Sequence, residues 1–332
     1  MPHLHTTLDQ PFRFFQGLIT QTSAPLTTRR VRLRRSRIGA VLGVAFGATG
    51  IGVAHCCRAD DGAPAITTRL LPGAADAGER LAALVAVNGY QHLPVVATLP
   101  ADACQLFSIT RPVVARHELA QAAAWQVQDE LAQPLDETLL DVCDDCSAGD
   151  PARVWVVAAA LRAVEHHTRL LEKAGLDVDA LDAPTLTLRN LALQLHAERP
   201  PLWLLLAGEP QLLCVIAGGR PWLQRRMQPI TGSDTARAQR LAEELERTRS
   251  YLLHRHGFPA CDGRLLIVGE ATLARTLVDA MAGKPGFDSC QRLADAHVAA
   301  LGDQPRSATA CVLQMLACAA ALRGHRSWLA TA

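Results

Sequence analysis

The feature that most constrains the fold is an apolar run over residues 38–57 that contains five glycines. It follows an arginine-rich block at residues 29–37 and just reaches the roughly 20 apolar residues that a membrane-spanning helix needs. A Gly-Ala-Thr-Gly turn signal at residues 47–50 divides the run. The pattern therefore favours a β-hairpin, with strands near 38–45 and 51–57, over a transmembrane anchor.

Charge is distributed unevenly along the 332 residues. Residues 1–37 hold seven arginines and one aspartate, whereas the rest of the chain holds 26 basic and 31 acidic side chains. A total charge near zero argues against a nucleic-acid-binding protein, and no aromatic side chains alternate with the arginines. We expect a basic, poorly ordered tail whose residues 29–37 are either solvated or in contact with anionic lipid.

From residue 38 the chain alternates predicted strands and helices, and the pattern starts again after Pro200-Pro201. Each half opens with antiparallel strands around a glycine-containing turn and continues into helices and further strands. A chain of 332 residues is long enough for about two domains. The sequence therefore predicts a duplicated α/β plan with a cleft between the halves.

One predicted helix, over residues 116–132, carries a tryptophan outside its apolar stripe. The stripe consists of residues four positions apart, Leu119, Ala123, Val127 and Leu131. Trp125 lies about 240° around the helical wheel from Leu119, among polar residues that include Glu118. Trp125 and Glu118 are therefore candidates for binding a partner peptide. The alternative is that Trp125 packs against a neighbouring subdomain.

The ten cysteines lie mostly in apolar runs, which is typical of buried, reduced thiols and favours the cytoplasm. Cys143 and Cys146 have the spacing of half a zinc site. A structural zinc site takes four ligands, however, and no second pair follows. We therefore expect no metal and interpret these two residues as exposed loop thiols.

Several short segments match a known family in order and spacing. They are GVAFGATG at 43–50, VVATLP at 95–100, AGL at 174–176, LD at 181–182, LRN at 188–190, AEELERTRSY at 242–251, LIVG at 266–269 and ALR at 321–323. Together they resemble PilM, the actin-like cytoplasmic protein of type IV pilus assembly. They resemble more closely its MshI branch, which serves the mannose-sensitive haemagglutinin (MSHA) pilus.

The resemblance implies an α/β fold of the actin-like, or ribonuclease H-like, ATPase class. It implies a first lobe at residues 38–199, a second lobe at 200–332 and a small α/β subdomain inserted at about 94–142. It also implies a partner, the cytoplasmic tail of a PilN-like inner-membrane protein, and through that protein an indirect link to the pilus assembly motor. The expected location is the cytoplasm, peripheral at the inner membrane.

Actin-like ATPases hold nucleotide phosphates between two glycine loops, each with an aspartate for Mg²⁺ or its waters. The family's first loop reads G-[IL]-D-[IL]-G, which corresponds here to Gly43, Ala45 and Gly47, with Ala45 at the aspartate position. Its second loop reads D-[IL]-G, which corresponds to Leu206 and Gly208, with Leu206 at the aspartate position. Both metal-binding carboxylates are therefore replaced.

The adenine loop of the family has two glycines, and here Gly269 is followed by Glu270. Because positioning and charge neutralisation supply most of phosphoryl-transfer catalysis, we expect a pseudo-ATPase with no catalytic residues. We expect no cofactor, and ATP binding without turnover stays open. The loop glycines either line a vestigial pocket or form tight turns.

These features together predict a non-catalytic adaptor in MSHA-type pilus biogenesis. It would capture the PilN-like tail in a groove of the first half that involves the inserted subdomain and Trp125. The main alternative is an active actin-like ATPase or kinase, against which Ala45 and Leu206 argue. A membrane protein anchored by residues 38–57 is a third possibility.

Overall fold

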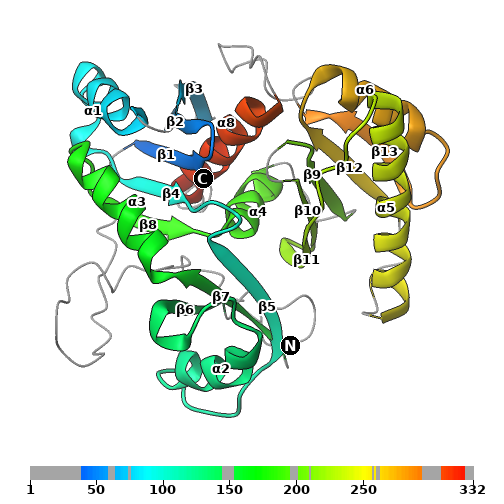
Figure 1. Cartoon of the computed structure of the whole chain (residues 1–332), viewed down its shortest axis with the longest axis horizontal. Coiled ribbons are helices and arrows are strands. Elements are labelled where there is room, and N and C mark those ends of the chain that lie inside the picture. The colour runs from blue at the N-terminus through cyan, green and yellow to red at the C-terminus, as the bar shows by residue number, and fades with distance from the viewer. Residues whose placement is uncertain are drawn as a thin grey trace, which may run out of the picture.

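The structure, a computed structural model, describes residues 39–58, 64–73, 76–143, 153–194, 201–208, 211–255, 258, 262–293 and 308–325. The basic tail at residues 1–37 lies outside these ranges. Within them the chain forms two five-stranded sheets and one three-stranded sheet, with helices packed on their faces (Figure 1).

The first sheet begins with the expected hairpin. Its strands are β1 (Ala40–Gly47), β2 (Gly50–Arg58), β3 (Pro64–Pro72), β4 (Val95–Thr98) and β8 (Val178–Asp182), in the order β3-β2-β1-β4-β8. β1 pairs antiparallel with β2, and the register closes at Gly47 opposite Gly50, which confirms the hairpin. Among the residues described, no helix has both the length and the apolar character that a membrane crossing needs.

The second sheet repeats this plan. Its strands are β9 (Leu202–Leu206), β10 (Leu212–Ala217), β11 (Arg220–Arg226), β12 (Gly263–Val268) and β13 (Phe287–Arg292), in the order β11-β10-β9-β12-β13. In both sheets three antiparallel strands are followed by two parallel ones. The shared order and directions confirm the predicted α/β, actin-like fold.

The three-stranded sheet belongs to the inserted subdomain. It consists of β5 (Cys104–Thr110), β7 (Arg153–Ala160) and β6 (Thr138–Cys143), in that spatial order. Helix α2 (Leu119–Val127) packs on it, with 3₁₀ turns at Gln128–Glu130 and Leu135–Glu137. The expected bounds of 94–142 are wrong, because β4 pairs within the first sheet and β7 pairs with β5 and β6.

In the described residues, six further helices pack on the two large sheets. They are α1 (Ala77–Asn88), α3 (Leu161–Lys173), α4 (Pro184–Gln194), α5 (Asp234–Arg255), α6 (Ala271–Met281) and α8 (Ala308–Ala321), with 3₁₀ turns at Tyr90–His92 and Leu322–His325. Helices α1 and α3 pack into one core with the first sheet, and α5 and α6 pack into another with the second. Helices α4 and α8 lie between the two sheets (Figure 1).

Helix α8 follows the second half in sequence but packs on the first sheet, against β1 and β2. Its backbone approaches these strands so closely that only glycine fits opposite it. A Cβ atom added to Gly43 would lie 2.0 Å from the carbonyl oxygen of Ala317, and one added to Gly52 would lie 2.3 Å from that of Leu313. Residues 200–332 therefore do not form one separate lobe, because their last helix completes the first.

This close approach predicts a sharp position dependence for glycine substitution. The Gly43→Ala variant should lose about 3 kcal/mol of unfolding free energy. Its methyl group would overlap the backbone of α8, which cannot move away by changing a side-chain rotamer. Urea denaturation measures the loss. Gly39→Ala is the matched control, since a Cβ atom there meets nothing within 4 Å. Equal stability of the two variants would contradict the packing of α8 on β1.

Candidate functional site

The first predicted phosphate loop lies against α8. Residues 43, 45 and 47 of β1 point to one face of the sheet, because successive side chains of a strand alternate. A Cβ atom at Gly47 would lie 2.6 Å from a methyl carbon of Leu313. A Cβ atom at Gly43 would likewise overlap the backbone of α8. Ala45 is completely buried within the apolar core between the sheets. The position that carries the aspartate in the family is thus covered.

The second predicted carboxylate position is buried in the same core. Leu206 ends β9 and is completely buried, in one cluster with Ala45, Val268 and apolar residues of α4 and α8. An ionised carboxylate in such surroundings would lose its hydration, which is costly unless a metal or a cation pairs with it. An aspartate at this position would therefore place its carboxylate among apolar side chains.

The segments predicted to be the second phosphate loop and the adenine loop contact one another. The Ala207 N–H donates a 2.7 Å hydrogen bond to the carbonyl of Val268, and a Cβ atom at Gly269 would lie 3.0 Å from that of Ala207. Gly208 and Gly269 are both buried, whereas Glu270 is exposed. The two loops meet because β9 and β12 are neighbouring parallel strands. Glu209 and Pro210 lie outside the described residues.

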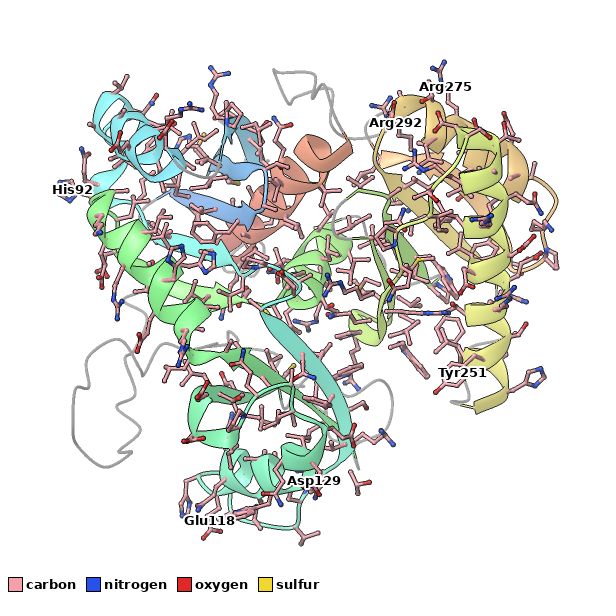
Figure 2. The ribbon with its side chains drawn as sticks, viewed as in Figure 1. His92, Glu118, Asp129, Tyr251, Arg275 and Arg292 are labelled. Carbon is pink, nitrogen blue, oxygen red and sulfur yellow. The ribbon has the colours of Figure 1, made fainter. Side chains whose placement is uncertain are left out.

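A pocket of about 290 Å³ opens elsewhere, between α6 and β13. It is lined by Arg275, Val278, Asp279, Cys290, Gln291 and Arg292. Figure 2 shows Arg275 and Arg292 at the outer end of the second lobe. None of the loop residues expected to bind nucleotide lines this pocket.

The cysteines support no metal site in the part of the chain that the structure describes. No group of three or more His, Cys, Asp or Glu residues there could hold a metal ion. Cys143 is fully buried at the end of β6 and disulfide-bonded, so the expectation of an exposed loop thiol is wrong for it. Cys146 lies outside the described residues. Burial raises the pKa of Cys104 and Cys214 to about 12, so these thiols stay protonated at neutral pH.

Trp125 lies on the outer side of α2. The helix buries Leu119, Ala123 and Val127 against the small sheet, as the apolar stripe predicts. Trp125 is 62% exposed, a high value for a large aromatic side chain. The structure thus places it on the surface of the inserted subdomain and not against a neighbouring subdomain.

Around Trp125 the outer face of α2 is polar. The exposed residues on this face, which follow helical spacing, are called the tip surface. They are Glu118, Gln121, Trp125, Gln128 and Asp129. Figure 2 shows Glu118 and Asp129 at the end of the inserted subdomain that is remote from both lobes. The Glu118 carboxylate also accepts a 3.3 Å hydrogen bond from the Ala115 N–H, which fixes the turn before the helix.

Sequence reasoning missed two further apolar residues of this subdomain. Val113 and Val114 are 102% and 44% exposed in the segment just before α2. Among the residues described, the exposed large apolar side chains are Val87, Val113, Val114, Trp125 and Tyr251. Three of these five lie within residues 113–125, so the exposed large apolar side chains are concentrated on the inserted subdomain. No periodic pattern marks a valine pair in a loop.

Comparison with known proteins supports the fold. No protein-family model matches the chain, and no curated protein does. Among solved structures, a PilM-PilN type IV pilus biogenesis complex aligns with a TM-score of 0.62 and 21% identity over 87% of this chain and 99% of that chain. At this identity the likeness shows a shared fold, and the chain has that actin-like fold.

More distant solved structures align less well. The cytoplasmic domain of EpsL, an inner-membrane component of the type II secretion system of Vibrio cholerae, gives a TM-score of 0.46 at 17% identity, over 69% of this chain and 82% of that chain. A Bacteroides thetaiotaomicron protein with an actin-like ATPase fold gives 0.45 at 7% identity, over 73% and 87%.

The burial of Ala45 predicts that restoring the family's aspartate harms the protein. Ala45→Asp should lose about 3 kcal/mol or more of unfolding free energy at neutral pH, because an unpaired carboxylate would enter an apolar core. Burial would raise the pKa of the new carboxyl, so the loss should be smallest below about pH 4, where only the overpacking by the larger neutral side chain remains, and should grow as the pH rises.

Chemical denaturation at several pH values measures this dependence. Ala48→Asp, in the exposed turn after β1, is the control and should change stability little at any pH. An Ala45→Asp protein as stable as the Ala48→Asp control would show that the loop is open to water.

Proposed function

We propose that this chain is a non-catalytic, actin-like adaptor of MSHA-type type IV pilus biogenesis, which binds the cytoplasmic tail of a PilN-like inner-membrane protein. The observation that carries the proposal is its alignment with almost the whole length of a chain of the PilM-PilN complex. The exposed Trp125 supports it, because aromatic side chains that a partner buries on binding commonly contribute most of the binding energy. The MshI assignment rests on the sequence resemblance.

The tip surface is the site that we propose for the tail. It combines a large apolar side chain with two carboxylates, Glu118 and Asp129, and therefore suits a segment with an apolar residue next to a basic one. Because it lies at the far end of the inserted subdomain, a bound tail would not have to enter between the lobes. Val113 and Val114 extend the apolar area available to the partner.

We propose that the adaptor is a pseudo-ATPase that needs no cofactor. Support comes from Ala45 and Leu206, which fill the two carboxylate positions inside an apolar core. We place the protein in the cytoplasm, peripheral at the inner membrane, with an indirect link to the assembly motor. Residues 29–37, outside the described part, would add attraction to anionic lipid.

The alternative function is an active actin-like ATPase or kinase. The contact between Gly269 and Ala207 favours it, because it keeps the second phosphate loop next to the adenine loop. The missing carboxylates disfavour it, since Mg²⁺ is held mainly by such oxygens.

Titration of the protein with ATP and Mg²⁺ distinguishes the two functions. We expect no heat of binding at micromolar nucleotide and no phosphate release above the buffer blank, because Ala45 and Leu206 stand at the two positions where a carboxylate would hold the metal. A purified actin-like sugar kinase serves as the positive control for both assays. Micromolar affinity with turnover would overturn the pseudo-ATPase proposal and favour the enzyme.

Substitution of Trp125 tests the adaptor function. Trp125→Ala should weaken binding of a PilN-like tail peptide at least about tenfold, since loss of an aromatic anchor costs about 1.4 kcal/mol or more. Fluorescence anisotropy with a labelled peptide measures the affinity. Tyr251→Ala, which removes a 48% exposed aromatic side chain on α5, is the matched control and should bind normally.

The two negative results have different meanings. If the unaltered protein does not bind the peptide at tens of micromolar, the adaptor function itself fails. If it binds and Trp125→Ala binds equally well, the adaptor function survives but the tip surface is not the site.

A further inference from the structure

Helix α4 carries a run of buried polar side chains at the centre of the molecule. Thr185, Thr187, Arg189 and Asn190 are between 0% and 9% exposed. The helix follows β8 of the first sheet and packs against β10 and β11 of the second, so it crosses from one lobe to the other (Figure 1). Buried polar groups must find hydrogen-bond partners, and the partners here belong to different lobes.

One of these side chains binds the first lobe. The hydroxyl groups of Thr187 and Thr98, on β4, lie 3.1 Å apart and are fully buried. The Thr187 hydroxyl also donates to the Ala183 carbonyl at 3.2 Å. Thr98 therefore donates to Thr187, and this hydrogen bond joins α4 to the end of β4, next to the edge strand β8 of the first sheet.

Two others bind the second lobe. The Thr185 hydroxyl donates to the side-chain carbonyl of Gln224 on β11. The Nε–H of Arg189 donates a 2.6 Å hydrogen bond to the carbonyl of Gly219, in the turn between β10 and β11. Gly219 has φ +72°, and a Cβ atom there would lie 3.0 Å from a methyl carbon of Leu193 on α4. The turn thus fits closely on the helix.

A further contact fixes the end of α8 to the first sheet. Helix α8 follows the second sheet in sequence, and Arg323 just beyond it forms an ion pair with Asp182 at the end of β8. The side chains are 11% and 3% exposed, so the pair is largely removed from water. A charged pair held away from water is costly to separate, because each partner would be left unpaired.

We propose that these contacts form an interlobe lock that holds the two lobes in one orientation. Two contacts of the lock, Thr185–Gln224 and Arg189–Gly219, join α4 to the second lobe. The other two, Thr98–Thr187 and Asp182–Arg323, fix α4 and the end of α8 to the first sheet. Rotation of one lobe against the other would break at least one of these contacts and leave a buried polar group without a partner. The chain therefore acts as a rigid body and does not open and close between its sheets. The inference goes beyond the proposed function and stands whether or not Trp125 binds a tail.

Distance measurements between the lobes test the lock in the full chain. Fluorophores are attached through non-canonical amino acids at Val87 on α1 and Arg240 on α5, which are exposed and leave the native cysteines untouched. Single-molecule energy transfer should give one narrow distance distribution, unchanged by Mg²⁺ and ATP. Two populations, or a shift on addition of nucleotide, would overturn the proposal.

Variants show whether the named contacts hold the lobes. Thr187→Val combined with Arg189→Met removes one tie to each lobe with little change of volume, and should widen the distance distribution about twofold or more. Thr168→Val is the matched control, because it removes a buried hydroxyl on α3 that makes no hydrogen bond to the described residues. Circular dichroism checks folding, and Thr187→Val alone replaces the double variant if that does not fold. A distribution as narrow as in the control would overturn the lock.

Discussion

The structure depends on how closely α8 approaches the first sheet. Two glycines, Gly43 and Gly52, leave room for the helix backbone to lie directly on β1 and β2. The side chains on the other sides of α8 can then reach the second sheet, and every described side chain from Val312 to Ala321 is buried. One continuous apolar cluster results, with members from both sheets, α4 and α8. A larger residue at either glycine would push the helix outward and separate the two lobes from their shared core.

The same packing determines what chemistry the loops can support. Ala45 and Leu206 lie inside the cluster that α8 completes. A carboxylate at either position needs water or a metal ion beside it, and a tightly packed apolar core admits neither. The core has thus closed around both positions that the sequence resemblance aligns with the family's aspartates. The packing also explains why these positions hold glycine, because a Cβ atom at Gly43 or Gly47 would overlap α8 and one at Gly269 would lie close to Ala207.

Local patterns predicted the local structure. The turn signal at 47–50 gives the β1–β2 hairpin, and the four-residue spacing from Leu119 gives the buried side of α2. Membership of a sheet depends on distant partners, so periodicity could not place β4 in the first sheet and β7 in the small one. Nor could it place α8, because a helix that is apolar on all sides indicates burial without indicating which sheet it covers.

Buried polar side chains and exposed large apolar side chains lie in different parts of the described structure. Polar side chains within the core are concentrated on α4, where they bind both lobes, and exposed apolar side chains are concentrated on the inserted subdomain, remote from that core. A partner that binds the tip surface meets a helix held on a rigid base, so little conformational freedom is lost on binding. The space between the two large sheets is filled by apolar side chains of α4 and α8, whereas the exposed Trp125 lies on the inserted subdomain. Under the function that we propose, such a rigid body would keep a bound partner in a fixed position.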